Sequence, residues 1–355
     1  MRSAVAALAL LSAGCVAAPP AGAAVVHEPS LSRNALAAAQ HSTFREVLCA
    51  TLAETAPQAG PCEAFLWRDK TEPARALDVL ALGPLRHRWR IVMVSGYGSD
   101  CFAPWVRMYG DARARLAEIG VTVTDAPVAG LSGTAWNAAI VAETVLGLGD
   151  DPSAKTMLLG YSKGAADILE ALGSYPAAAA RVDAVLSISG SLGGAQLAET
   201  APAALDFLID HAPGTACGPH DDRALWSLRP DVRAFRLRSN PRPPEPPLFV
   251  LASFVERDRV STGLLAGWTE LSRRGADTDG QLTVDEQVTD GAVLLGHPRA
   301  DHWAVALPIE TAASTLSAVL VDRNTYPRAP LIESAIRFVD QAQKNDGFWL
   351  GNGSA

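Results

Sequence analysis

Residues 156–172 combine an apolar run, a glycine-flanked serine and an amphipathic segment. The run Met157–Leu159 is typical of a buried strand, and the later apolar side chains follow helical spacing at Ala165, Ile168, Leu169 and Leu172. Between them, Gly160-Tyr161-Ser162-Lys163-Gly164 matches the pattern G-x-S-x-G, in which a serine occupies a strained turn and side chains at the glycine positions would collide with neighbouring backbone. A bare match can arise by chance in a chain with 29 glycines, but its place between strand and helix makes Ser162 a candidate nucleophile.

Composition narrows the class of protein. The chain has 355 residues, of which 48% are hydrophobic, so it can bury a large core. Its formal net charge is −8 and it contains no basic block, which argues against nucleic acid as a partner. After residue 25 no apolar run approaches the roughly 20 residues that a membrane span needs. We expect residues 25–355 to form a single domain.

Residues 1–24 are predicted to be a signal peptide. Arg2 supplies the positive start, Ala4–Leu11 the apolar core, and small residues follow. Cleavage near Ala21–Ala24 would release a soluble protein, secreted or periplasmic, and we favour this route. Alternatively, the segment that ends at Cys15, Leu-Ser-Ala-Gly-Cys, resembles a bacterial lipobox, which would make Cys15 a lipid anchor to the cell envelope.

The other four cysteines predict two disulfides, because an exported chain meets an oxidising compartment. Cys49 and Cys62 are close in sequence and form the natural pair, which leaves Cys101 to pair with Cys217. No C-x-x-C spacing typical of a zinc site occurs.

The strand and helix patterns alternate along the chain. Strands are predicted at 91–94, 121–128, 156–161, 182–189, 248–254 and 291–295, and helices at 36–51, 103–119, 132–148, 309–321 and 332–342. This alternation predicts an α/β fold with a mainly parallel sheet and helices on both of its faces.

A glycine-rich loop follows the strand at 91–94, with Gly96, Tyr97 and Gly98. A dinucleotide loop would need a third glycine at the position of Cys101, and no phosphate-binding P-loop pattern occurs, so we predict no cofactor. The loop instead fits an oxyanion loop, with a backbone N–H near Tyr97 as donor.

A nucleophilic serine of this kind needs a histidine base and an acid, which follow it in the order acid, then histidine. His302 is the preferred base, in the loop after the last predicted strand; His297 is the second choice, and His220 precedes the acid region. The residue pattern leaves three acids open: Glu256 and Asp258, just after the strand at 248–254, and Asp279, in an Asp-Gly turn.

From Arg90 to about Leu307 the chain resembles the α/β-hydrolases, and in places the secreted bacterial triacylglycerol lipases. Those lipases carry their catalytic aspartate in an Asn-Asp-Gly-Leu-Val segment and their catalytic histidine in an Asn/Asp-His-hydrophobic context. The matching segments here are Thr-Asp-Gly-Gln-Leu around Asp279 and Ala-Asp-His-Trp around His302. The resemblance therefore implies Asp279 as the acid, with Asp258 second. It also implies that the insertion at residues 195–247 covers the active site as a cap, where a plain reading gives a long surface loop.

Three positions depart from the lipase pattern. Tyr161 and Ser95 stand where those lipases usually have histidines, before the nucleophile and in the oxyanion motif. Ala304 stands where they have an aspartate that binds calcium, so we predict no metal.

Together these features predict an exported serine hydrolase that acts on a small-molecule or lipid ester, similar to lipases and carboxylesterases. The backbone N–H groups of Tyr97 and Lys163 would hold the oxyanion, while the Lys163 side chain is expected in solvent. Thioesterase, polyester depolymerase, acyltransferase and peptidase activity stay open as alternatives. Outside enzymes, so do a non-catalytic binding module and a lipid-anchored envelope protein with a scaffolding role.

Overall fold

A six-stranded parallel sheet forms the centre of the molecule. The computed structural model describes residues 35–68, 82–200, 209, 215–312 and 325–342. The strand order is β2-β1-β3-β4-β5-β6, and every neighbouring pair is parallel. All six predicted strands are present, as β1 Arg88–Val94, β2 Thr122–Asp125, β3 Ala154–Tyr161, β4 Ala184–Ile188, β5 Leu248–Leu251 and β6 Ala292–Gly296.

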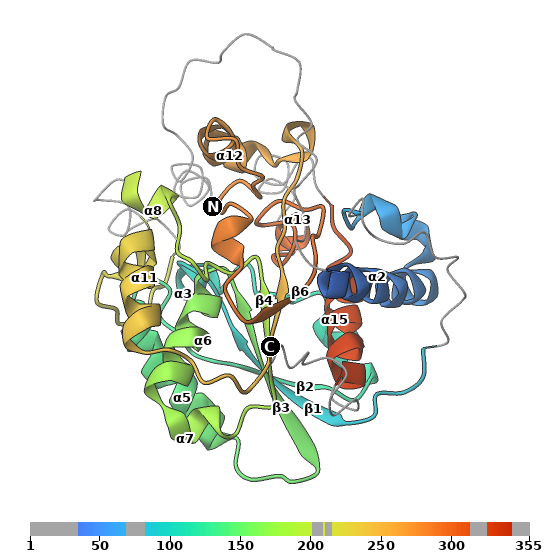
Figure 1. Cartoon of the computed structure of the whole chain (residues 1–355), viewed down its shortest axis with the longest axis horizontal. Helices are drawn as coiled ribbons and strands as arrows, with labels where there is room; N and C mark the ends of the chain where they lie inside the picture. The colour runs from blue at the N-terminus through green and yellow to red at the C-terminus, as the bar shows by residue number, and fades with distance from the viewer. Residues whose placement is uncertain (1–34, 69–81, 201–208, 210–214, 313–324, 343–355) are drawn as a thin grey trace.

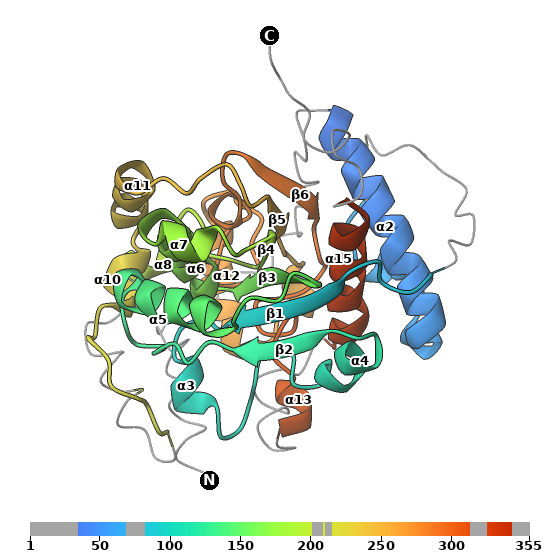
Figure 2. The ribbon, with the colours of Figure 1, turned by 90° about the horizontal axis from the view of Figure 1, so that it is seen from below.

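Helices cover both faces of this sheet, as predicted, because successive strand side chains point to opposite sides. Ile91 and Met93 join the apolar cluster with α2 and α15, whereas Val92 and Val94 join the cluster with α5 and α6. Figure 2 shows the sheet between these two layers. The four helices are α2 Ala35–Thr55, α15 Arg328–Ala342, α5 Thr134–Gly147 and α6 Lys163–Ser174.

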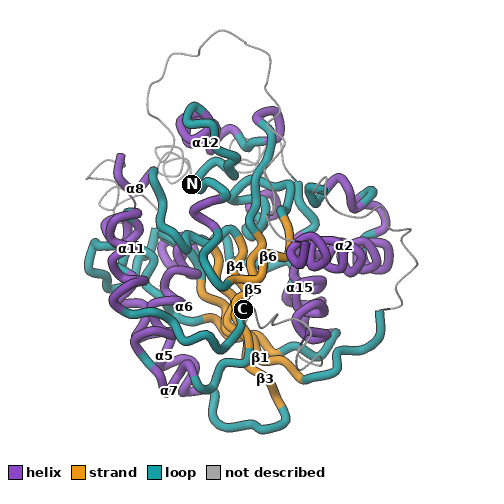
Figure 3. The backbone as a smooth tube through the Cα atoms, in the orientation of Figure 1, coloured by secondary structure: helices purple, strands orange, loops and turns teal. Residues whose placement is uncertain are grey.

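The remaining elements are short. They are the helices α3 Ser99–Phe102, α4 Arg113–Glu118, α7 Pro176–Ala179, α8 Leu197–Thr200, α10 Ala224–Leu228, α11 Pro230–Ser239, α12 Leu265–Ser272 and α13 Ile309–Ala312. The 3₁₀ turns are η1 Pro57–Ala59, η2 Cys62–Ala64, η3 Arg257–Arg259, η4 Thr262–Leu264 and η5 Asp285–Gln287. In Figures 1 and 3, α12 lies above the sheet, beyond the loops that gather over the strands. None of the helices in the described ranges is long and apolar enough to cross a membrane.

The helix predicted over 103–119 is wrong in its first half. Only Arg113–Glu118 is helical there, and residues 103–112 form turns. Two features break the helix: Tyr109 has a left-handed φ of 51°, and its N–H donates to the carbonyl of Ala306 at 2.9 Å. Trp105, placed on the buried face by the helical spacing, is 36% exposed as a result.

Two other predictions fall largely outside the described residues. The helix predicted at 309–321 begins as α13, but residues 313–324 lie outside that range. The signal peptide and Cys15 also lie outside it.

Both predicted disulfides are confirmed. Cys49 pairs with Cys62 and ties α2 to η2, and Cys101 pairs with Cys217. The second bond joins α3, which directly follows the glycine-rich loop, to the insertion at 195–247. That loop is therefore covalently connected to a segment more than 100 residues later, at a sequence separation of 116.

Candidate active site

Ser162 occupies a strained turn between β3 and α6, with φ 55° and ψ −128°. The two flanking glycines are required by space. A Cβ at Gly160 would lie 2.6 Å from the Cα of Ala165, and one at Gly164 would lie 2.6 Å from the carbonyl carbon of Val94. Backbone atoms cannot move aside cheaply, so larger residues would push the turn away from β1 and α6. The turn leaves Ser162 half-buried.

His302 lies beside this serine, in the loop after β6. Its Nε2 is 2.9 Å from Ser162 Oγ, and its backbone N–H donates to the carbonyl of Asp279 at 2.9 Å. The imidazole is almost fully buried. A histidine within hydrogen-bond reach of a serine hydroxyl can accept the hydroxyl proton as the oxygen becomes a nucleophile.

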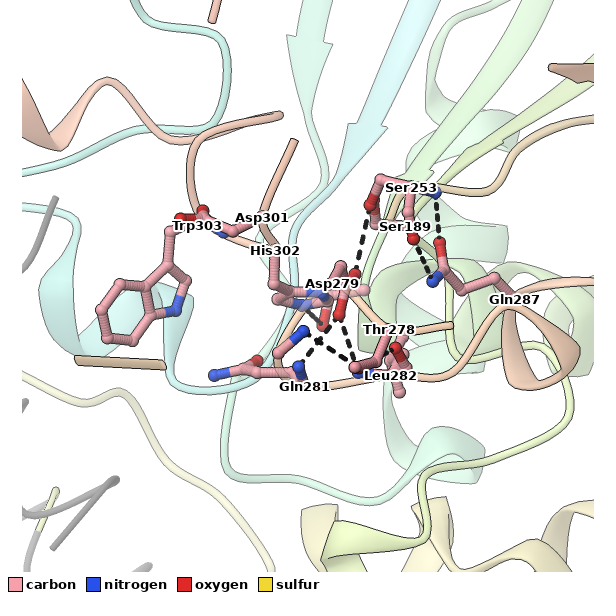
Figure 4. Close-up of polar contacts among 12 residues, drawn as sticks. Ser189, Ser253, Thr278, Asp279, Gln281, Leu282, Gln287, Asp301, His302 and Trp303 are labelled. Atoms are coloured by element: carbon pink, nitrogen blue, oxygen red, sulfur yellow. Dashed lines mark hydrogen bonds and ion pairs between the residues drawn. The ribbon is translucent and has the colours of Figure 1, made fainter. Parts of the chain in front are cut away.

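Asp279 contacts the ring nitrogen of His302 that does not face Ser162. Its Oδ2 is 2.7 Å from His302 Nδ1, and its Oδ1 accepts hydrogen bonds from the backbone N–H groups of Gln281, at 2.9 Å, and Leu282, at 2.8 Å. Figure 4 shows the carboxylate between these partners. Because an ionised carboxylate only accepts hydrogen bonds, Nδ1 is the donor and Nε2 is the acceptor that faces Ser162. Gly280 has a φ of 97°, which lets the chain turn sharply beside the carboxylate.

The other sequence candidates have other surroundings. Asp258 is exposed on η3, and Glu256 pairs with Arg299. His297 is buried with its Nδ1 2.8 Å from the carbonyl of Ala252, and His220 pairs with Asp222 at 3.0 Å. The structure thus brings together Ser162, Asp279 and His302 from the expected set, although their chemical roles stay predictions.

The glycine-rich loop after β1 lies against Ser162. A Cβ at Gly96 would lie 2.8 Å from the Cβ of Ser162. The loop is fastened on two sides by Asp100, whose carboxylate accepts from the backbone N–H groups of Gly130, at 2.8 Å, and Gly218, at 2.9 Å. Tyr97 therefore follows a residue in contact with Ser162, while the N–H of Lys163, in the first turn of α6, has no partner within that helix.

The Lys163 side chain is buried, so the prediction that it lies in solvent is wrong. Its Nζ is 2.8 Å from both carboxylate oxygens of Asp167, one turn later on α6. Asp167 also accepts from the Asn137 amide at 2.8 Å. Burial lowers the pKa of Lys163 and raises the pKa of Asp167, while the attraction between their charges opposes both shifts. This burial is possible because Asp167, at i+4, pairs with the ammonium and Asn137 donates to the same carboxylate.

Three polar side chains near His302 and Asp279 were not predicted from the sequence. The Tyr161 hydroxyl donates to the carbonyl of His302 at 2.7 Å. Asp301 accepts from the Ser261 hydroxyl at 2.5 Å and anchors the loop before His302, and burial raises the pKa of its carboxyl. Ser253, just after β5, contacts Asp279. Tyr161 could have been noticed in the sequence, because it replaces a histidine of the lipase pattern. Nothing in the local sequence marks Asp301 or Ser253.

No metal ligand set emerges from the described residues. Among them, the group of His, Cys, Asp and Glu side chains close enough to hold an ion is Cys49, Cys62 and Glu63. Both cysteines form the first disulfide, so neither offers a thiolate. Ala304 has no side-chain oxygen with which to bind calcium.

The fold and part of the sequence are shared with proteins of known structure. The metagenomic carboxyl esterase MGS0156 is similar with a TM-score of 0.78 and 32% sequence identity, over 84% of this chain and 91% of that one. The lipase BlEst2 of Bacillus licheniformis, in its mature form, shares the fold with a TM-score of 0.50 and 22% identity, over 62% of this chain and 87% of that one. The sequence matches no protein-family model and no curated protein.

Proposed function

The chain belongs to the α/β-hydrolase family of esterases and lipases, and we propose that it is an exported serine hydrolase that cleaves carboxylic esters. The observation that carries the proposal is the pair of hydrogen bonds on His302, 2.9 Å from Nε2 to Ser162 Oγ and 2.7 Å from Nδ1 to Asp279 Oδ2. A half-buried hydroxyl, a buried imidazole and a buried carboxylate in one line form the geometry of a serine–histidine–aspartate triad.

The first half of the reaction forms an acyl-enzyme. Ser162 Oγ attacks the ester carbonyl carbon as His302 Nε2 takes the hydroxyl proton. Asp279 holds the imidazole in the reactive tautomer and stabilises its positive form. The tetrahedral intermediate then collapses, the bond to the alcohol oxygen breaks, and His302 returns the proton to the leaving alcohol. In the second half water replaces the alcohol, and its attack on the acyl-enzyme releases the carboxylic acid.

Negative charge develops on the carbonyl oxygen in both halves. We assign its stabilisation to the backbone N–H groups of Tyr97 and Lys163. Support comes from the contact of the Gly96 position with Ser162 and from the place of Lys163 at the start of α6. One such donor is typically worth about 100- to 1,000-fold in rate.

We assign the role of a cap to the insertion at 195–247. In its described part, Cys217 is bonded to Cys101, and Ile209 is buried in an apolar cluster with Cys101 and Leu131. This attachment to the loop beside Ser162 supports a cover over the site.

Export is the location that fits best. The two disulfides are compatible with an extracellular or periplasmic protein, where thiols become oxidised. The choice between cleavage near Ala21–Ala24 and lipidation of Cys15 is testable by mass spectrometry of the mature N-terminus.

The test is hydrolysis of p-nitrophenyl esters, from acetate to palmitate, by purified protein with Ser162→Ala as the control. We expect wild-type turnover with a preferred chain length, and none by the variant. Matched thioester and anilide substrates separate an esterase from a thioesterase or peptidase. Turnover of no ester by the wild type, or equal turnover by Ser162→Ala, would contradict the proposal.

A further inference from the structure

Oδ2 of Asp279 has a second partner besides His302. The hydroxyl of Ser253, two residues past the end of β5, lies 3.2 Å from the same oxygen that holds His302 Nδ1. Ser253 and Asp279 are both fully buried. Figure 4 shows Ser253 and His302 at the same carboxylate. The acid therefore has hydrogen bonds from four donors, of which Ser253 supplies the only one from a hydroxyl among the described residues.

A second hydroxyl, that of Ser189, continues the chain. Ser189 Oγ lies 2.5 Å from Ser253 Oγ, and either serine can donate in an isolated pair. The carboxylate removes this ambiguity. Because an ionised Asp279 only accepts, Ser253 must use its single proton toward Asp279, and Ser189 must donate to Ser253. The hydroxyls thus form a directed chain from Ser189 through Ser253 to Asp279, in which each bond polarises the next.

Other groups hold the backbones of the two serines in place. One side chain, Gln287, clamps the Ser253 backbone: its Oε1 accepts from the Ser253 N–H at 2.7 Å and its Nε2 donates to the Ser253 carbonyl at 2.8 Å. Ser189 follows β4 in a left-handed conformation with a φ of 47°, and its N–H donates to the carbonyl of Leu251 at 2.9 Å. Ser189 is fully buried, and its hydroxyl reaches Ser253, the partner of Asp279. Functional sites retain backbone strain of this kind.

We propose that Ser253 is a positioning residue of the triad, which fixes Asp279 Oδ2 toward His302 Nδ1 and is itself oriented by Ser189. The inference rests on the proposed function, since it assumes that Ser162, His302 and Asp279 carry the hydrolysis. Ser253 acts on rate through Asp279 and touches no substrate. Removing its hydroxyl leaves His302 as the only partner of Oδ2 among the described residues, so the negative charge of that oxygen acts more strongly on the imidazole.

Ser253→Ala is the primary variant, and Ser187→Ala is its matched control. Ser187 lies on β4, is equally buried, and its hydroxyl has no hydrogen-bond partner among the described residues. We expect Ser253→Ala to lower kcat about 10-fold at unchanged KM, the scale of one hydrogen bond to a charged group. Ser189→Ala should lower kcat less, and Ser187→Ala should leave kcat unchanged. Wild-type kcat in Ser253→Ala, or an equal loss in Ser187→Ala, would overturn the proposal.

The pH dependence of kcat/KM distinguishes this role from a merely structural one, because loss of a structural contact alone would leave the profile unchanged. Stronger attraction between Asp279 and the imidazolium favours the protonated base, so the acid limb of the kcat/KM profile should shift to higher pH in Ser253→Ala. Asp301, Glu286 and Tyr161 also interact electrostatically with Asp279, and all three stay in place in this variant. A lower kcat with an unshifted limb would mean that Ser253 does not act through the charge of Asp279, and would also overturn the proposal.

A double-mutant cycle of Ser253→Ala and Asp279→Asn tests whether Ser253 acts through Asp279. The readout is the rate at which a fluorophosphonate labels Ser162, which needs no complete turnover. If Ser253 acts through Asp279, adding Ser253→Ala to Asp279→Asn should cost nothing further, whereas additive losses would refute the proposal. Absence of ester hydrolysis by the wild type would instead reject the proposed function, so the two failures are distinguishable.

Discussion

The phenol of Tyr161 donates a 2.7 Å hydrogen bond to the carbonyl oxygen of His302, across 141 residues of sequence. The two rings also pack together, with centroids 5.1 Å apart. Burial raises the pKa of Tyr161 well above its ordinary value, so the phenol stays protonated as a donor. The residue before Ser162 therefore ties the end of β3 to the loop that carries His302.

Tyr161→Phe removes this hydroxyl and keeps the ring. We expect the free energy of unfolding to fall by about 1–3 kcal/mol, because the buried carbonyl of His302 loses its donor. We also expect kcat to fall by less than 10-fold, since the ring contact remains. Denaturant unfolding and ester hydrolysis measure the two effects. The control is Tyr175→Phe, at a tyrosine that is 37% exposed. Equal free energies of unfolding and equal kcat values in the two variants would show that the Tyr161 hydrogen bond contributes to neither.

Asp279→Asn should cost far more activity than Asp258→Asn. Loss of the acid leaves the imidazole in the wrong tautomer, which costs roughly 10,000-fold in kcat in the serine-protease example. Asp258 is exposed on η3, so its replacement should leave kcat within about twofold of the wild-type value, as for surface substitutions in general. Steady-state kinetics on both variants decide the assignment, and a dead Asp258→Asn with an active Asp279→Asn would reverse it.

Lys163→Met makes stability depend on pH through Asp167. Without the ammonium, the burial that already raises the pKa of Asp167 is less opposed. An acid whose pKa is higher in the folded than in the unfolded protein stabilises the folded state at pH values below the unfolded-state pKa of about 3.9. This stabilisation is lost as the pH rises through the folded-state pKa. The variant should therefore be close to wild type at pH about 4 and less stable by about 3–5 kcal/mol at pH about 8, where Asp167 is left as an unpaired buried charge.

Lys155→Met is the matched control for this prediction. Lys155 pairs with Asp183 at 3.0 Å, but both side chains are about one-third exposed. An exposed pair of this kind contributes about 0–1 kcal/mol, so its loss should change stability little at any pH. Urea unfolding at both pH values checks the pair of variants, and a pH-independent deficit in Lys163→Met would argue against a charged Asp167.

The two disulfides should differ in their effect on activity. Replacing Cys101 and Cys217 by serine frees the loop beside Ser162, whereas replacing Cys49 and Cys62 frees only α2 from η2. Each double replacement should cost about 2–5 kcal/mol of stability. Only the first should also lower kcat, because the loop that carries the proposed oxyanion donor Tyr97 loses its anchor. Equal kcat values in the two double variants, measured at a temperature below both of their Tm values, would contradict this role of the Cys101–Cys217 bond.

Much of the fold was predictable because its signals are local. Continuous apolar runs such as Ile91–Val94 mark strands that are buried on both faces, and the glycines around Ser162 record a collision that the structure displays directly. The disulfide pairing followed from count and spacing. The aspartate before Gly280 was recognisable because an Asp-Gly turn leaves a visible pattern, although its choice over Asp258 needed the family resemblance.

The parts that failed depend on distant contacts. The helix expected through Trp105 is broken by a hydrogen bond from Tyr109 to Ala306, almost 200 residues away in sequence. Lys163 looked like a surface cation, yet Asn137 of α5 and Asp167 make its burial tolerable. Ser253 and Ser189 are ordinary serines in sequence, and only the adjacency of β4 and β5 brings them together.

The central claim is that Ser162 is the nucleophile of this hydrolase, activated by His302 and Asp279. The most direct measurement is peptide mass spectrometry of the protein after reaction with a fluorophosphonate, alongside Ser162→Ala treated in the same way. Our account predicts one phosphonyl adduct per chain, on the peptide that contains Ser162, with parallel loss of p-nitrophenyl ester hydrolysis, and no adduct in the variant. An adduct on another residue, or ester hydrolysis that survives in Ser162→Ala, would contradict it.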